Sequence, residues 1–79
     1  MTAKIKLIWD FRGQTATPIA QHHVVHLNEY IKINELPLQI TGFETHSSLY
    51  ATAFMVVYQS DMLAVRDALK PHRAVVFEE

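Results

Sequence analysis

The chain begins with a segment in which apolar and polar positions alternate. Between residues 4 and 11, every second residue is apolar, and these residues fall on one face: Ile5, Leu7, Trp9 and Phe11. A period of two over this length predicts a half-buried strand. The run Arg12-Gly13-Gln14 then ends the predicted strand.

The next segment has the period of a helix. Apolar residues recur at helical spacing and define one stripe: Ala16, Ala20, Val24, Leu27 and Ile31. Thr17 followed by Pro18 is typical of a helix start, with Thr17 as the N-cap. Because Pro37 disfavours a helical residue before it, the predicted helix ends near Leu36.

Residues 38–45 and 49–58 predict two strands joined by a tight turn near His46 and Ser47. If Thr45 pairs with Ser48, the residues on the face beneath the helices are mostly small or aliphatic. The opposite face then carries a different set: Gln39, Thr41, Phe43, Tyr50, Thr52, Phe54, Val56 and Tyr58. A slip of one residue would mix the two sets, so the pattern favours this register.

A second helix and a last strand complete the chain. Ser60 is a typical N-cap with Asp61 in the first turn, Pro71 ends the helix, and residues 73–77 predict a strand. The order βαββαβ predicts one ferredoxin-like α+β domain over residues 1–79. Right-handed connections place both helices on one face of a four-stranded antiparallel sheet of order 4-1-3-2.

The opposite face of this sheet is predicted to be bare. Its outward residues form a candidate interface: Ile8, Phe43, Tyr50, Phe54, Val56 and Tyr58. Apolar patches of this kind usually mark a binding surface, although aromatic residues also favour strands without any partner. We expect a homodimer that packs sheet against sheet. A small ligand bound between such sheets and RNA are the competing occupants.

The chain order and the aromatic residues of 49–58 resemble the RNA-recognition motif at the level of the fold. That family carries a basic residue, then glycine and aromatic residues at a spacing of two on the third strand, and an aromatic residue on the first. Here the third strand reads Leu49-Tyr50-Ala51-Thr52-Ala53-Phe54-Met55-Val56, without a basic residue or glycine and with a spacing of four. The motif is not met, so the sequence does not favour nucleic acid as a partner.

Composition supports the same conclusion. Seven Lys and Arg residues stand against eight Asp and Glu residues, for a formal net charge of -1, whereas nucleic-acid-binding proteins usually carry a basic excess. There is no cysteine, which is typical of a reducing compartment. Residues 1–4 lead directly into the first strand without a signal-peptide pattern, and no apolar run is long enough to span a membrane. We therefore expect a cytoplasmic protein.

Histidines supply a candidate metal site. His22 and His26 are four residues apart on the predicted helix, and Glu29 lies three residues further on the same side. Two imidazoles and a carboxylate can bind zinc, but the glutamate of the H-E-x-x-H motif is replaced by His23. We expect an exposed polar helix face and no high-affinity metal site, and we expect no cofactor.

A candidate ligand or catalytic cleft lies where the first and third strands are expected to end. Asp10 and Arg12 end the first strand, Tyr58 ends the third, and His23 lies on the edge of the helix stripe, where we expect a half-buried ring with one hydrogen bond. No nucleophile elbow or phosphate loop is present in the sequence.

Three functional hypotheses follow. The first is a small self-associating binding or regulatory module that dimerises through its bare sheet face. The second is a small enzyme or ligand-binding protein with the cleft near Asp10, Arg12, His23 and Tyr58. The third is a metal-binding protein that uses His22, His26 and Glu29.

Overall fold

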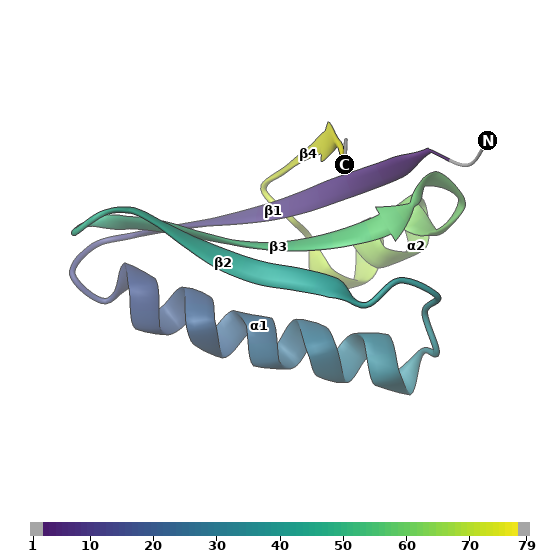
Figure 1. Ribbon diagram of the computed structural model, residues 1–79, viewed down its shortest axis with the longest axis horizontal. Coiled ribbons are helices and arrows are strands. Elements are labelled where there is room, and N and C mark those ends of the chain that lie inside the picture. The colour runs from purple at the N-terminus through teal and green to yellow at the C-terminus, as the bar shows by residue number, and fades with distance from the viewer. Residues whose placement is uncertain (1–2, 78–79) are drawn as a thin grey trace.

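The computed structural model of this protein describes residues 3–77. Helices and strands follow one another in the predicted order: β1 (Lys4–Arg12), α1 (Ala16–Ile33), β2 (Ile40–Ser47), β3 (Tyr50–Tyr58), α2 (Gln59–Leu69) and β4 (Arg73–Val76). The strands form one antiparallel sheet, and both helices lie against the same face of it (Figure 1). The predicted βαββαβ arrangement of the α+β class is confirmed.

The strand order is β2-β3-β1-β4, which is the predicted order read from the other edge. The two central strands run antiparallel over their whole length, from Lys4 opposite Tyr58 to Arg12 opposite Tyr50. Strand β4 is short and pairs only with residues 5–8 of β1. The carboxyl ends of β1 and β3 therefore lie at opposite ends of the sheet.

Helix α1 starts two residues earlier than predicted. Its first residue is Ala16 and its N-cap is Thr15, whose side chain makes no capping hydrogen bond. The predicted cap, Thr17, lies inside the helix, and its hydroxyl is 3.0 Å from the hydroxyl of Thr45 on β2. The hydroxyl that would cap an isolated helix is used to join the helix to the sheet.

The apolar stripe of α1 faces the sheet as predicted. Four of its members are buried: Ala16, Ala20, Leu27 and Ile31. Val24 is partly buried and packs against the core. The helix ends at Ile33, before the predicted end near Leu36. The backbone N–H of Leu36 donates to the carbonyl of Ile31 at 3.0 Å, so the chain turns at this point and leaves the helix.

The β2–β3 hairpin differs from the predicted register. Ser47 lies opposite Tyr50 and Thr45 lies opposite Ala51, so His46 is an extra residue on β2 that forms a bulge. The turn consists of residues 48–49 and not 46–47. Because a single extra residue exchanges the two faces of a strand, every β2 residue before the bulge lies on the face opposite to the predicted one.

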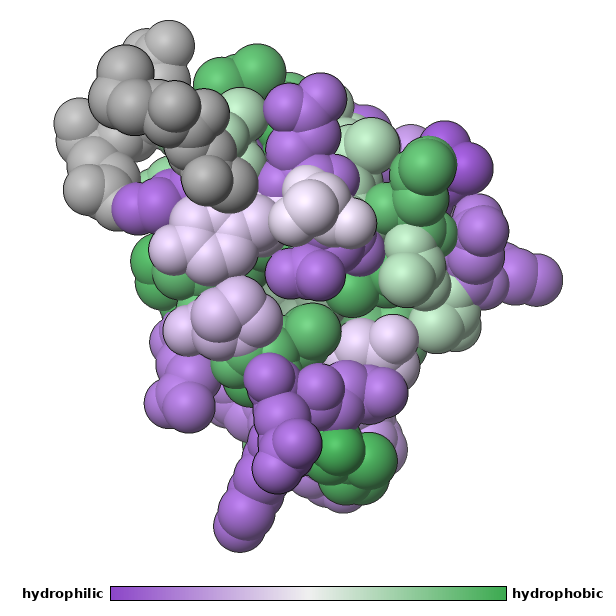
Figure 2. All heavy atoms as spheres, turned by 90° about the vertical axis from the view of Figure 1, so that its right-hand side faces the viewer, coloured by the Kyte–Doolittle hydropathy of each residue, from purple (hydrophilic) through white to green (hydrophobic). Residues whose placement is uncertain are grey.

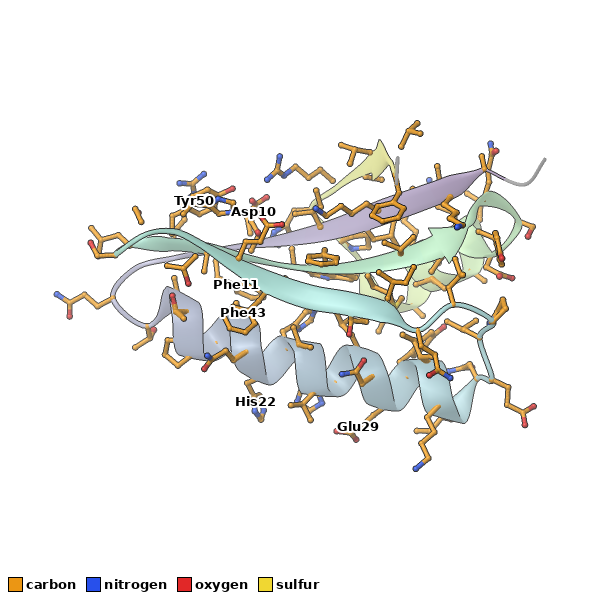
Figure 3. All side chains as sticks on the ribbon, viewed as in Figure 1. Asp10, Phe11, His22, Glu29, Phe43 and Tyr50 are labelled. Carbon is orange, nitrogen blue, oxygen red and sulfur yellow. The ribbon has the colours of Figure 1, made fainter. Side chains whose placement is uncertain are left out.

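This correction moves Phe43 off the predicted interface. Phe43 lies opposite Ala53 and points toward the helices (Figure 3). Thr41 also lies on the helix side, where its hydroxyl donates to Asn28 Oδ1 of α1 at 2.7 Å. In exchange, Ile40 and Gly42 lie on the open side of the sheet.

The core lies between the sheet and the two helices. Strands β1 and β3 supply most of the core residues: Leu7, Trp9, Ala51, Ala53, Met55 and Val57. The α1 stripe and Val65 of α2 supply the rest. Helix α2 begins at Gln59, one residue before the predicted cap Ser60. Val65 is the one buried residue of this helix, so α2 covers the sheet less completely than α1 does.

Figure 2 views the molecule from the right-hand side of Figure 1. Hydrophilic and hydrophobic residues are interspersed over the described part of this end. Within residues 3–77, neither helix has the length and apolar character needed to cross a membrane.

Candidate functional site

The face of the sheet away from the helices, here called the outer face, is the candidate functional surface. The strand register places its residues in rows, which run in order along the sheet: Ile40, Val56, Lys6 and Val75; then Gly42, Phe54, Ile8 and Arg73; then Glu44, Thr52 and Asp10; and finally Ser47, Tyr50 and Arg12. The first two rows, except Arg73, form the apolar half of the outer face. Tyr58, which lies beyond the first row, also belongs to this half. The last two rows form a polar half, which Arg73, His46 and His72 join through their contacts.

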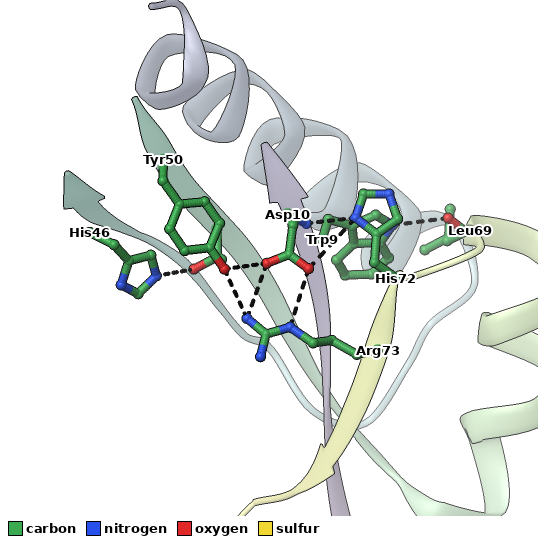
Figure 4. A network of polar contacts seen from close by, with 8 residues as sticks. Trp9, Asp10, His46, Tyr50, Leu69, His72 and Arg73 are labelled. Carbon is green, nitrogen blue, oxygen red and sulfur yellow. Dashed lines mark hydrogen bonds and ion pairs between the residues drawn. The ribbon is translucent and has the colours of Figure 1, made fainter. Parts of the chain in front are cut away.

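Asp10 is the centre of the polar half (Figure 4). Its Oδ1 accepts a hydrogen bond of 2.5 Å from the Tyr50 hydroxyl. Arg73 donates from Nη2 to Oδ1 at 3.0 Å and from Nε to Oδ2 at 3.2 Å, which makes a bidentate ion pair. The same Nη2 donates to the Tyr50 oxygen at 3.1 Å. Three strands, β1, β3 and β4, thus meet through one closed cluster.

These contacts move the pKa values of the cluster away from neutrality. The hydrogen bond from Tyr50, and after it the contacts with Arg73, lower the pKa of Asp10 against the opposing effect of burial. The hydrogen bond to the Asp10 carboxylate raises the pKa of Tyr50 and also that of Arg73. General acid–base catalysts work best with a pKa near the working pH. An ionised Asp10 and a protonated Tyr50 therefore form a fixed electrostatic cluster and a poor acid–base pair.

The loop before β4 is fastened beside this cluster. The backbone N–H of Asp10 donates to His72 Nδ1 at 2.7 Å, so this ring nitrogen carries a lone pair and not a proton. The backbone N–H of His72 donates to the Ile8 carbonyl at 2.9 Å. One residue before Asp10, Trp9 Nε1 donates to the Leu69 carbonyl at the end of α2, at 3.0 Å (Figure 4). Arg73 is thereby held within reach of Asp10.

Tyr50 is also contacted from both neighbouring strands. The guanidinium carbon of Arg12 on β1 lies 4.1 Å from the centre of the Tyr50 ring. The ring of His46, the bulge residue of β2, stacks on Tyr50 with centres 4.8 Å apart. The Nε2 atom of His46 lies 2.9 Å from the hydroxyl of Thr52. The bulge therefore places the His46 side chain on the outer face, where it contacts Tyr50 and Thr52.

The apolar half centres on Phe54, whose ring leans over Gly42. A Cβ atom on Gly42 would lie only 2.8 Å from Phe54 Cζ, so glycine leaves the space that the ring occupies. The ammonium of Lys6 lies 4.4 Å from the ring centre and 3.5 Å from Glu44 Oε1. The apolar half thus contains a lysine whose charge is paired with Glu44 of the neighbouring polar half.

The structure does not bring the four predicted cleft residues together. Asp10 and Arg12 lie at one end of the outer face, whereas Tyr58 pairs with Lys4 at the other end. The prediction treated the ends of β1 and β3 as neighbours, and it is wrong because these strands are antiparallel. His23 lies on the opposite side of the sheet, in contact with Trp9.

His23 is half-buried on α1, as predicted, but its expected hydrogen bond is not found at Nε2. That atom is buried and has no hydrogen-bond partner among residues 3–77. The ring lies with its centre 4.9 Å from that of Trp9 and 5.4 Å from that of Phe11. Burial disfavours the charged imidazole and lowers the pKa of His23, with smaller contributions from the nearby histidines.

Five of the six predicted interface residues lie on the outer face, and Phe43 does not, for the reason given above. Two of the five are already covered by the chain itself, since Val56 is 0% and Ile8 is 8% exposed. The accessible apolar surface is therefore smaller than the sequence pattern suggests. It consists of partly exposed side chains, and these include Ile40 and Val75, which the prediction left out.

The predicted histidine face of α1 is present. His22, His26 and Glu29 are exposed. His22 and Glu29 lie on the side of α1 away from the sheet (Figure 3), and His26 contacts His22. The two Nε2 atoms lie 3.0 Å apart, and His26 Nδ1 lies 4.0 Å from Glu29 Oε1. Over residues 3–77, no group of three or more His, Asp or Glu side chains is placed to hold a metal ion.

Sequence reasoning missed Arg73, His46 and His72 as members of the polar half. Antiparallel pairing of the first and third strands would have placed Tyr50 beside Asp10 and Arg12. Pairing of the last strand with the first would have placed Arg73 next to Ile8. The position of His46 depends on the bulge, for which the sequence carries no clear signal.

Comparisons with known protein families, with curated proteins and with solved structures found no match to this chain.

Proposed function

We propose that this chain is a small binding module that self-associates through the apolar half of its outer face, most simply as a two-fold dimer. The observation that carries the proposal is a patch of apolar side chains, interrupted by Lys6, on the one sheet face that neither helix covers. Four of them remain partly accessible: Ile40, Phe54, Tyr58 and Val75. A second copy offers a surface of the same character, and a two-fold axis satisfies both surfaces at once.

The dimensions of the sheet limit the size of this interface. Four strands about 4.8 Å apart, with central strands of nine residues at about 3.3 Å per residue, span a face of at most roughly 19 by 30 Å. The apolar half of this face is smaller than the roughly 800 Å² that a standard interface buries on each partner, which is typical of a weak and transient contact. Two cations in or beside the apolar half are paired within the chain, Lys6 with Glu44 and Arg73 with Asp10. This pairing reduces the repulsion between two identical surfaces.

The expected affinity is low. Burying the accessible part of each of these four side chains contributes at most roughly 1 kcal/mol, so the eight side chains of two copies contribute at most roughly 8 kcal/mol. Association costs an estimated 4–15 kcal/mol of lost freedom, on the order of the gain. Even at the lowest cost, the net free energy of association is only about 4 kcal/mol, so we expect a dimer at chain concentrations on the order of 1 mM. The absence of cysteine in the sequence supports a cytoplasmic location as a further part of the proposal.

Sedimentation equilibrium with a matched pair of variants tests the proposal. Val75 is 44% exposed on the outer face, on the short edge strand β4, so the glutamate of Val75→Glu can remain in solvent in the monomer and the variant should keep the fold. Leu63 is 55% exposed on α2, and Leu63→Glu makes the same change of charge away from the outer face. We expect Val75→Glu to be monomeric at a concentration where the wild type and Leu63→Glu are dimers.

A wild-type chain that keeps the 9.1 kDa mass of the monomer up to millimolar concentration would refute self-association. That result would leave the outer face as a surface for a small ligand, which is the competing proposal. Equal effects of Val75→Glu and Leu63→Glu would show that any association uses a different surface.

A further inference from the structure

We propose that His22 and His26 form a two-imidazole chelate for a late first-row divalent metal ion, with Cu²⁺ bound more tightly than Zn²⁺. Their Nε2 atoms point at one another across 3.0 Å on the exposed side of α1. Two nitrogen ligands of a tetrahedral zinc ion, each at about 2.05 Å from the metal, lie about 3.4 Å apart. The two rings therefore need only a small outward rotation to accept an ion between them.

The helix pre-organises this pair. His22 and His26 lie in the interior of α1, well away from both of its ends, so their backbone separation is fixed by helical geometry. The two rings lie nearly perpendicular, at an interplanar angle of 85° with their centres 4.6 Å apart. Both residues are exposed, which leaves the remaining coordination positions to water.

Glu29 influences which ring nitrogen of His26 carries the proton. Its Oε1 lies 4.0 Å from His26 Nδ1 and favours a proton on that nitrogen, which leaves the lone pair on Nε2. His22 Nε2–H then donates to His26 Nε2. On metal binding, the ring proton of His22 moves from Nε2 to Nδ1 through solvent, and two waters leave the ion. No net proton is released when both rings start neutral.

The ligand set also limits the affinity. Because no third ligand lies in reach within the described residues, the protein supplies two ligands and not the four of a structural zinc site. We expect a dissociation constant no tighter than about 1 µM, in keeping with the sequence-based expectation of no high-affinity site. Imidazole ligands favour copper over zinc and exclude magnesium. The site lies on the opposite side of the sheet from the outer face, so it does not depend on self-association.

Calorimetric titration of the full chain with Cu²⁺, Zn²⁺ and Mg²⁺ in a non-coordinating buffer tests the proposal. We expect one Cu²⁺ per chain, weaker Zn²⁺ binding and no Mg²⁺ binding. The variant His26→Ala should weaken Cu²⁺ binding at least tenfold. The double variant Gln21→His with His22→Gln retains all five histidines but separates the pair by five residues, and it should lose affinity to the same extent.

Circular dichroism of each variant establishes that α1 is intact before the titration is interpreted. A double variant that binds Cu²⁺ as tightly as the wild type would overturn the proposal, because binding would then follow histidine content and not spacing. Absence of Cu²⁺ binding at millimolar concentration would also overturn it, and so would one ion bound per two chains.

Discussion

The contact between Gly42 and Phe54 predicts a mutation whose effect changes sign with its background. In the wild type, the Cβ of Gly42→Ala would approach Phe54 Cζ to 2.8 Å and Cε1 to 2.9 Å, well inside normal contact. The ring must then leave its place and its position under Lys6. Overpacking of a core costs about 1–3 kcal/mol, and the lower end applies here because the clash is with the tip of a partly exposed ring that can move. Replacing glycine by alanine at a compatible backbone position stabilises by about 0.4–1 kcal/mol, so the net loss should be no more than about 0.6 kcal/mol.

The variant Phe54→Val removes the ring atoms that make the clash and keeps a residue that favours strands. In that background, Gly42→Ala should stabilise the protein by about 0.4–1 kcal/mol. Urea unfolding of the four chains gives the coupling energy directly, and in thermal unfolding a loss of 1 kcal/mol corresponds to about 4–8 °C for a domain of this size. Equal effects of Gly42→Ala in both backgrounds, to within about 0.5 kcal/mol, would refute the described position of Phe54.

Two further predictions concern titrating groups. The hydrogen bond from Tyr50 is the largest cause that lowers the pKa of Asp10, so Tyr50→Phe should raise that pKa more than Arg73→Lys does. NMR titration of the Asp10 carboxyl measures the pKa in both variants. A larger rise in Arg73→Lys than in Tyr50→Phe would contradict the described cluster. The pKa of His23 is lower in the folded chain than its ordinary value of about 6.5, so the unfolded chain takes up the proton first as the pH falls. The free energy of unfolding should therefore be at its full value above about pH 6.5 and should decline below it, and this decline should be smaller in His23→Gln. An equal decline in both chains would mean that other groups cause it.

The sequence was sufficient to predict the architecture because the two structural periods are clearly separated along the chain. Alternation in β1 and the 3.6-residue stripe of α1 identify the faces that become buried, and Leu7, Leu27 and Ile31 lie in the core as expected. The order of these elements, with right-handed connections, then determines the order of strands in the sheet.

The hairpin could not be predicted in the same way. Strand β2 carries neither a regular alternation nor a strong turn signal, so its register depended on the assumed turn. The bulge at His46 exchanged its faces, and Phe43 and Thr41 moved to the helix side. Tertiary contacts such as that of Thr41 with Asn28 select this register, and a local pattern does not contain them.

The polar half was missed because it is assembled by contacts between strands far apart in the sequence. Asp10 and Arg73 are 63 residues apart, and each alone is an ordinary charged residue near the end of a strand. Only the antiparallel pairing of β1 with both β3 and β4 brings Tyr50 and Arg73 to the same carboxylate. The predicted cleft failed for the same reason, since it assigned Tyr58 to the wrong end of the sheet.

An isotope-filtered NOE experiment on an equimolar mixture of labelled and unlabelled chains tests self-association through the outer face most directly. It detects contacts between copies without any substitution. The account predicts intermolecular NOEs that involve Phe54, Ile40 and Val75. Intermolecular NOEs that involve Leu63 of α2 in place of these residues, or none at all at millimolar concentration, would contradict it.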